Sequence, residues 1–293
     1  MNLTDVLQRK TNGSILLAAL WLTAFGVALS SYTQTTQRVG GTLVVAVPVQ
    51  EGLVACSDKR LYNDTTGTFT DTYVKIHQVN SNALFVATHT TGFLDATTGK
   101  MAFDIFDVTA GFVSKNDFKP SPAYWDSLKK EIRDQLLAYL SKRKYADWPA
   151  TDTANNKLLF NLVFYSVEKN AARSYSMSVF YEKAPTPVIY IPNVVGEEVK
   201  TPKLLGKGKD VIALLARNPK LSNDPSFQRF DQYSFLPAKT TVGEAVDFAK
   251  KLFEITNNSL PQAQVSKTYD CALLGYQTGF RWLDSSGRSV AVK

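Results

Sequence analysis

A threonine directly after a Gly-Gly pair is the residue whose position most clearly indicates chemistry. Thr42 follows Gly40 and Gly41 and opens an apolar run. A threonine hydroxyl is a weak nucleophile, but an N-terminal threonine carries its own base, the free α-amine, whose pKa of about 7.7–8 lies near neutrality. We therefore predict that Thr42 is a nucleophile exposed by cleavage of the Gly41–Thr42 bond. Glycine before that bond leaves the carbonyl accessible and permits strained backbone angles.

An aspartate lies at a spacing that could bring it to Thr42. Apolar runs flank the polar segment 50–52, a pattern typical of a buried β-hairpin. With the turn centred on residue 51, Val44 would lie opposite Asp58, and Thr42 would lie one diagonal step away on the same face. Asp58 would then reach the start of the first strand. The alternative interpretation is that Asp58 belongs to a solvated strand end and that Thr42 is an ordinary strand residue.

Lys75 is the expected counter-ion of Asp58. It stands between apolar Val74 and Ile76 in a strand-like run, and a lysine buried there without a partner would be costly. Paired with Asp58, it could hold the Thr42 hydroxyl and help to keep the amine unprotonated. Alternatively, Lys75 lies on an exposed face of its strand.

The remaining pattern predicts an α+β protein. Strands and helices occur in groups without strict βαβ alternation, which favours antiparallel sheets with helices packed on their outer faces. A Ser-Pro pair at 121–122 predicts a helix start, and Thr241 with Glu244 predicts a capping box. Expected strands span 73–79, 83–88, 99–107, 158–167, 175–183, 188–191, 269–274 and 280–283; expected helices span 121–144, 210–217 and a segment from 241.

The N-terminus resembles an export signal. Arg9-Lys10 precedes an apolar run over 15–29, and Ala28 and Ser30 form a small-x-small cleavage pattern. We expect residues 1–31 to be a signal peptide or, if uncleaved, a signal anchor with its apolar part in 14–31, so that the rest of the chain is periplasmic or extracellular. Residues 32–41 read as a short polar propeptide or linker, and 42–293 as the folded domain.

Charge and composition exclude several classes of function. The formal charge of +7 over 293 residues is a mild excess without a basic stripe, so we expect no nucleic-acid partner. The segment 206–209 lacks the spacing of a P-loop. His77 and His89 have no metal-ligand spacing around them, so the sequence predicts no metal and no cofactor. We interpret Cys56 and Cys271 as small buried hydrophobic residues; a disulfide in an exported protein remains the alternative.

These residues resemble a known family, the proteasome β-type subunits and bacterial proteasome-like peptidases of the N-terminal-nucleophile hydrolases. The resemblance rests on Gly41-Thr42, on the segment 52–58 ending in Asp58, on Lys75, and on the segment 84–95. It implies a four-layer αββα sandwich of two antiparallel sheets flanked by helices. It also implies that the backbone N–H of Thr91 contributes to an oxyanion hole.

The resemblance further implies a self-processing threonine hydrolase that cleaves peptide or other amide bonds and assembles as a homo-oligomer, since members of the family commonly form rings. Membrane contact would come only through an uncleaved N-terminal segment. The chain departs from the family at Lys207, where a serine usually assists the amine, and at Ala263, where an aspartate is expected before Ser266. A catalytically inactive proteasome-like scaffold or binding module is therefore the alternative, and an unrelated exported α+β protein is a further one.

Overall fold

The computed structural model describes most of the chain after its first 35 residues. The predicted signal segment and residues 32–35 of the predicted propeptide lie outside the described residues. Within the described part of the chain, no helix is both long and apolar enough to cross a membrane. The described ranges are 36–63, 66–95, 97–145, 148, 158–183, 186–231, 235–259 and 265–290.

One antiparallel sheet carries the predicted hairpin at its centre. Among the described residues it has six strands in the order β13-β2-β3-β14-β15-β16. Every residue of β2 and β3 is buried, because both faces of these strands are covered. The strands are β13 (Lys203–Gly206), β2 (Leu43–Val49), β3 (Gly52–Asp58), β14 (Tyr269–Gly275), β15 (Gly279–Leu283) and β16 (Ser289–Val290).

The second sheet has ten strands in the described residues, with the path β11-β10-β9-β7-β1-β4-β5; β12 also pairs with β10, and β6 and β8 pair with β7. Its central strand β7 is long and contacts β1, β6, β8 and β9. The strands are β1 (Thr36–Gly40), β4 (Leu61–Asn63), β5 (Phe69–Thr70), β6 (Ile76–Asn80), β7 (Ala83–Asp95), β8 (Met101–Asp104), β9 (Leu158–Glu168), β10 (Ala171–Glu182), β11 (Val188–Tyr190) and β12 (Val195–Glu198).

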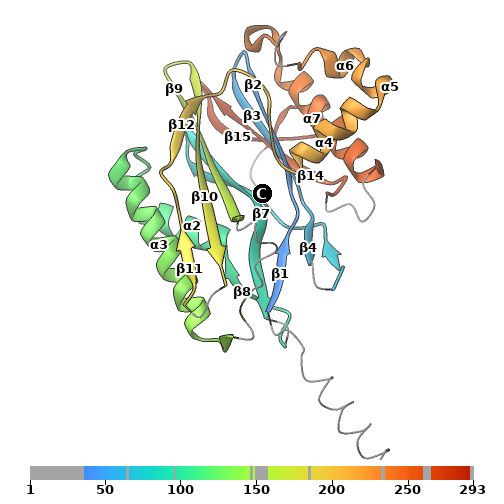
Figure 1. Cartoon of the computed structure of the whole chain (residues 1–293). Helices are drawn as coiled ribbons and strands as arrows, with labels where there is room; N and C mark the ends of the chain where they lie inside the picture. The colour runs from blue at the N-terminus through green and yellow to red at the C-terminus, as the bar shows by residue number, and fades with distance from the viewer. Residues whose placement is uncertain are drawn as a thin grey trace, which may run out of the picture. The chain divides into compact units, whose positions relative to one another are not determined.

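Helices cover the outer face of each sheet (Figure 1). Apolar side chains of α2 and α3 pack on the ten-stranded sheet, and those of α4 and α7 pack on the six-stranded sheet. A third cluster, from β2, β3, β7 and β9, fills the space between the sheets. The helices are α2 (Ile105–Val113), α3 (Pro122–Ser141), α4 (Gly208–Arg217), α5 (Pro219–Ser222), α6 (Pro225–Gln228) and α7 (Val242–Ser259), with the 3₁₀ turn η2 (Pro237–Lys239).

The layer order is therefore helix, sheet, sheet, helix, and the predicted α+β sandwich of two antiparallel sheets is confirmed. Strand β2 shows how the sequence sets this order. Leu43, Val45 and Val47 face the helix layer of α7, whereas Val44 and Ala46 face the other sheet. An unbroken apolar run is what a strand with two buried faces requires.

The predicted helix boundaries follow from caps that the structure shows. The Ser121 hydroxyl accepts from the Tyr124 N–H, and α3 begins at Pro122. Thr241 and Glu244 exchange hydrogen bonds of 2.9 and 3.3 Å at the start of α7, as a capping box does.

Three local predictions were wrong. The hairpin turn has only two residues, Gln50 and Glu51, so Val44 lies opposite Ser57 rather than Asp58. Thr36–Gly40, expected within a linker, forms the paired strand β1. Residues 105–107, expected in a strand, begin helix α2, because the Asp104 side chain caps the Phe106 N–H.

The interpretation of the cysteines as separate buried residues was also wrong. Cys56 of β3 lies directly opposite Cys271 of β14, and the two form a disulfide across 215 residues of sequence. Sequence spacing alone could not show this approach, because it depends on how the C-terminal strand pairs with the hairpin.

Candidate active site

Gly41 and Thr42 lie where the chain passes from one sheet to the other. Strand β1 ends at Gly40 in the ten-stranded sheet, and β2 begins at Leu43 in the six-stranded sheet. Gly41 adopts a positive φ of 78°, a conformation that favours glycine. Its N–H donates to the carbonyl of His89 over 3.2 Å. The crossing therefore fixes the Gly41–Thr42 peptide bond between two rigid strands.

Thr42 is buried, with 1% of its surface exposed. Its carbonyl accepts a hydrogen bond of 2.9 Å from the Lys207 N–H. Its Oγ1 is buried and has no hydrogen-bond partner among the described residues. Buried hydroxyls normally have a partner, so one without a partner calls for an explanation. A hydroxyl whose role is to react would be such a case.

Asp58 reaches the start of β2, although not by the predicted register. It ends β3, and its Oδ1 accepts from the Leu43 N–H over 2.8 Å. Its Oδ2 accepts from the N–H groups of Arg60, at 2.9 Å, and Ser266, at 3.4 Å. Asp58 is fully buried, and burial raises the pKa of its carboxyl while Lys75 and these donors oppose that rise. The carboxylate thus ties three segments together beside Thr42.

Lys75 completes the arrangement. Its Nζ lies 3.2 Å from Asp58 Oδ2 and donates to the carbonyl oxygen of Gly41 over 2.8 Å. It also donates to the carbonyl of Arg60, so all three ammonium protons can be used. The side chain is buried, and burial lowers the pKa of Lys75 while Asp58 opposes that change. The charge of the site is therefore aimed at the carbonyl of the bond before Thr42.

The predicted Asp58–Lys75 pair is thus present, in a fully buried form. Lys75 comes just before β6 rather than within it, at the end of the segment 71–75 that links β5 to β6. The interpretations that put Asp58 at a solvated strand end or Lys75 on an exposed face are wrong, since both side chains are 0% exposed.

Thr91 lies on β7 beside β1, in an irregular part of the pairing. Gly40 pairs with Thr90 and Val39 pairs with Gly92, so Thr91 falls within a bulge between them. Its hydroxyl donates to the Val39 carbonyl over 3.4 Å. The structure therefore places Thr91 next to β1, the strand that leads to Thr42. Its hydrogen bond is to Val39, two residues before Gly41.

His89 lies on β7 just before this bulge. It is a non-glycine residue at a positive φ of 70°, an uncommon conformation that often marks strain at functional positions. The surroundings of its ring exclude water in part, and this, together with the charges of Lys207 and Lys209, lowers the pKa of His89. Its carbonyl is the acceptor for the Gly41 N–H, so this residue of uncommon conformation positions Gly41 directly.

The departing residue Lys207 and the matching serine Ser266 both bond to groups other than Thr42, while the other departure, Ala263, lies outside the described residues. Lys207 Nζ lies 3.4 Å from Asp210 on α4. The Ser266 hydroxyl pairs with that of Thr268 at 2.7 Å. Ser266 nevertheless belongs to the site through its backbone N–H to Asp58.

Gly206 is a site residue that the sequence analysis missed. It ends β13 opposite Leu43 at a positive φ of 65°, and a Cβ there would lie 2.1 Å from the Thr42 carbonyl oxygen. Only glycine lets β13 approach so closely. The pair of glycines at 206 and 208 was the available signal.

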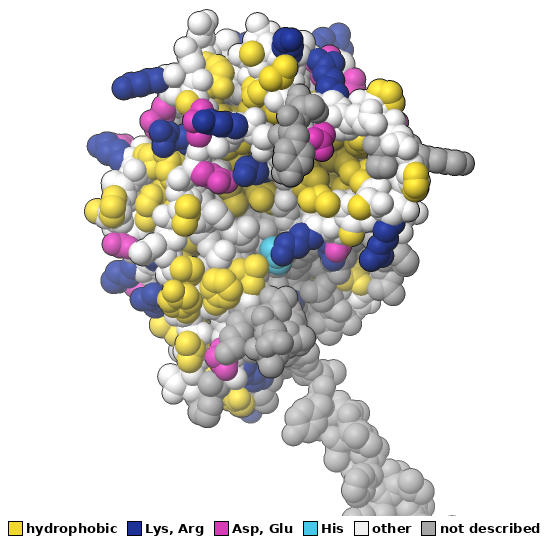
Figure 2. All heavy atoms as spheres, turned by 45° about the horizontal axis from the view of Figure 1, so that its top comes forward, with side chains coloured by type: hydrophobic (Ala, Val, Ile, Leu, Met, Phe, Trp, Pro, Cys, Tyr) yellow, Lys and Arg dark blue, Asp and Glu magenta, His cyan; other side chains and the backbone are white. Residues whose placement is uncertain are grey.

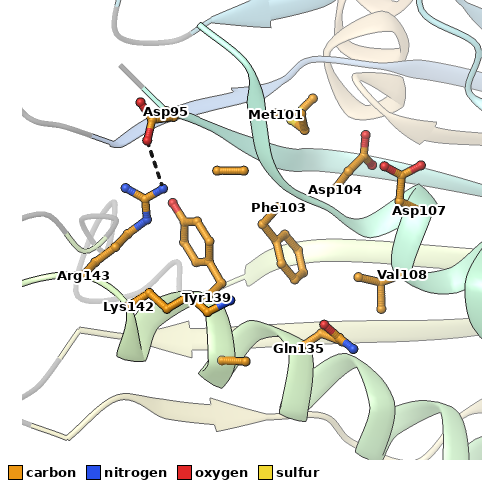
Figure 3. A pocket seen from close by; sticks show the side chains of 12 residues that line it. Asp95, Met101, Phe103, Asp104, Asp107, Val108, Gln135, Tyr139, Lys142 and Arg143 are labelled. Atoms are coloured by element: carbon orange, nitrogen blue, oxygen red, sulfur yellow. Dashed lines mark ion pairs between the residues drawn. The ribbon is translucent and has the colours of Figure 1, made fainter. Parts of the chain in front are cut away.

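A pocket of about 450 Å³ lies apart from Thr42, by the other end of β1 (Figure 3). Asp95 is one of its lining residues. It pairs with Thr36 at the start of β1, and its Oδ2 lies 3.6 Å from Arg143 Nη2. None of Thr42, Asp58 and Lys75 lines the pocket, so it is separate from the candidate site. Its charged and aromatic lining residues are Asp95, Phe103, Asp104, Asp107, Tyr139, Lys142 and Arg143.

The surface shows charges of both signs. On the face drawn in Figure 2, basic and acidic side chains are interspersed among apolar ones rather than gathered in a basic stripe. In the residues that the structure describes, no group of three or more histidine, cysteine, aspartate or glutamate side chains could hold a metal ion.

Comparison with known proteins gives likenesses among solved structures. No family model matches the chain, and no curated protein matches it. It is similar to a Gly-1 mutant of Anbu from Hyphomicrobium sp. strain MC1, at 14% identity and a TM-score of 0.41, over 86% of this chain and 85% of that one. It is also similar to Anbu, described as an ancestral beta-subunit, from Yersinia bercovieri, at 14% identity and a TM-score of 0.44, over 82% and 86%. At these values neither likeness carries an argument about function.

Proposed function

We propose that this protein is a self-processing N-terminal threonine hydrolase that cleaves peptide or other amide bonds. The observation that carries the proposal is the position of Lys75, whose ammonium contacts both Asp58 and the carbonyl oxygen of Gly41. A buried cation on that oxygen polarises the carbonyl that Thr42 would have to attack. The unpartnered Thr42 hydroxyl supports the same role.

Self-cleavage would proceed as an acyl shift followed by hydrolysis. Thr42 Oγ1 attacks the Gly41 carbonyl carbon, and the negative charge that develops on the Gly41 oxygen is stabilised by Lys75. The C–N bond then breaks, the proton of the hydroxyl ends on the Thr42 nitrogen, and an ester joins Gly41 to Thr42 Oγ1. Water hydrolyses this ester and leaves a Gly41 carboxylate and a free Thr42 amine.

Catalysis on other molecules would use the new amine. It takes the hydroxyl proton as Thr42 attacks an amide carbonyl, and it later returns a proton to the leaving amine. Lys75 and Asp58 would set the charge around it. The N–H of Thr91 is proposed as a donor to the oxyanion, since Thr91 lies in the bulge beside the strand that enters the site. Substrate would enter where β1 now lies, between β4 and β7.

Location and assembly belong to the same proposal. A disulfide between Cys56 and Cys271 suits an oxidising compartment, which supports export, with residues 1–31 as signal peptide or anchor. Residues 32–41 would be the propeptide removed with the cut. Assembly as a homo-oligomer, in the form of a ring, is proposed from the sequence resemblance alone.

Intact-mass analysis of the exported full chain tests this function. We expect a species that begins at Thr42, and we expect it to react covalently with a threonine-directed β-lactone or epoxyketone. Thr42→Ala should abolish both the species and the labelling, whereas Thr42→Ser should keep both. A wild-type chain that starts near Ser31 and never shortens would contradict the proposal.

A catalytically inactive scaffold or binding module is the second candidate. It is favoured by the side chains of Lys207 and Ser266, which bond to Asp210 and Thr268 instead of reaching the Thr42 nitrogen. An uncut wild-type chain that resists the electrophile would support this alternative.

A further inference from the structure

Strand β1 occupies the position between β4 and β7 in which the proposed function would place a substrate. We call this position the channel. Strand β1 pairs with both of its neighbours. Asn63 donates to the Gln37 side chain over 2.6 Å, and Val39 is 1% exposed. The residues of β1 therefore show what the channel can hold at each position before the bond that is attacked.

Gly40 occupies the tightest of these positions. A Cβ built on Gly40 would lie 2.1 Å from the carbonyl oxygen of His89, and 2.9 Å from both the His89 carbonyl carbon and the Thr90 Cα. All three atoms belong to the backbone, so no side-chain rotation could relieve the overlap. This position admits glycine alone unless the strand β7 moves.

His89 holds that obstruction in place. His89 has a positive φ of 70°, and its carbonyl oxygen, which lies against Gly40, also accepts the Gly41 N–H. The same oxygen thus crowds one residue and binds the next. Moving it away to make room at Gly40 would break the hydrogen bond that orients Gly41.

Gly41 adds a second restriction by its conformation. Its φ of 78° is one that residues with a side chain adopt at a cost, because the Cβ crowds the backbone. The two consecutive positions are restricted by different means, one by space and one by backbone angle.

We infer that the channel between β4 and β7 selects extended peptides with two consecutive glycines before the bond to be cut. This inference rests on the proposed function and narrows its substrate class from amides in general to chains that carry a diglycine. The glycine at position 40 is the discriminating feature, since the oxygen that excludes a side chain there belongs to the enzyme's own β7.

Peptide substrates offered to the mature wild-type protein test the inference directly. Acetyl-Arg-Val-Gly-Gly coumarylamide would be compared with the same peptide carrying alanine at the first or the second glycine. We expect alanine at the first glycine to lower kcat/KM by about 100-fold, the order of loss that a misplacement of about 1 Å can cause. Equal turnover of the diglycine peptide and its first-position alanine variant would overturn the inference.

The full chain supplies a second test. Gly40→Ala should slow the appearance of the species beginning at Thr42 by a similar factor. Gly111→Ala is the matched control, because Gly111 lies in α2 and a Cβ there meets nothing within 4 Å. Self-cleavage of Gly40→Ala at the wild-type rate would count against a fixed obstruction by His89.

A third measurement separates this inference from the proposed function. If no peptide is hydrolysed and no cut occurs, the hydrolase proposal fails. Amide hydrogen exchange in the Thr42→Ala chain then shows whether the channel requires glycine at position 40. There, Gly40→Ala should speed amide exchange in β1, while Gly111→Ala should not. Unchanged protection of β1 in Gly40→Ala would refute the inference whatever the activity.

Discussion

Replacing Lys75 by methionine should destabilise the fold strongly, because it removes one half of a buried ion pair. The Asp58 carboxylate would stay buried with only backbone N–H donors, and the carbonyls of Gly41 and Arg60 would lose the donor they share. Breaking a buried pair in this way costs roughly 3–5 kcal/mol. At about 2–4 °C per kcal/mol for a domain of this size, Tm should fall by roughly 6–20 °C.

The assay is thermal unfolding followed by circular dichroism, with every variant made in the Thr42→Ala chain so that all remain uncut. The double variant Asp58→Asn, Lys75→Met is the matched control. It removes both charges, so it should lose less stability than the two single losses added together, with a coupling of roughly 0.5–3 kcal/mol. A Lys75→Met chain that melts with its parent, or strictly additive losses, would refute the reasoning.

The remaining predictions concern a crosslink, a titrating group and a tight approach. Replacing Cys56 and Cys271 together by alanine should lower the free energy of urea unfolding by roughly 2–5 kcal/mol, because the disulfide closes a long loop; an unchanged urea midpoint would contradict a formed bond. Burial lowers the pKa of His77 below its ordinary 6.5. The unfolded chain therefore binds the proton first as pH falls, and stability should drop from pH 7 toward 5 by at most about 1.4 kcal/mol per pH unit; His77→Gln should flatten this slope in unfolding curves. Gly206→Ala should reduce both Tm and self-cleavage, since its Cβ would overlap the Thr42 carbonyl, whereas Gly111→Ala, within α2, should lower neither; equal behaviour of the two would show that β13 can give way.

Much of the fold followed from local chemistry. The unbroken apolar runs of β2 and β3 indicated strands buried on both faces, and the capping residues at Ser121 and Thr241 indicated where α3 and α7 begin. These features depend on residues close in sequence, so a single chain displays them.

The parts that were missed depend on contacts between distant segments. β1 has a polar, unpatterned sequence, and its strand form comes from β4 and β7 on either side. The disulfide depends on β14 pairing with β3. The predicted hairpin register was wrong by one residue, because a two-residue turn and a three-residue turn fit the same sequence pattern.

The site shows the same division. Asp58 and Lys75 were predicted as partners because a buried charge needs another, and the structure brings them together with Gly41. The role of Gly206 was missed, and the His89 carbonyl was not foreseen, because each acts through backbone geometry. A backbone oxygen carries no signature in the residue name, so only the folded arrangement shows it.

The interior position of β1, between β4 and β7, bears on what happens just after the proposed cut. Breaking one covalent bond at Gly41 would leave the hydrogen bonds of β1 to β4 and β7 in place. The cleaved molecule would then be a complex with its own product: the Thr42 amine would be free, but the cleaved β1 segment would still occupy the position between β4 and β7. The delay between processing and first turnover would be set by the rate at which β1 dissociates from β4 and β7. Added Thr36–Gly41 peptide would not change this rate, but it could rebind in the same place and block the site again.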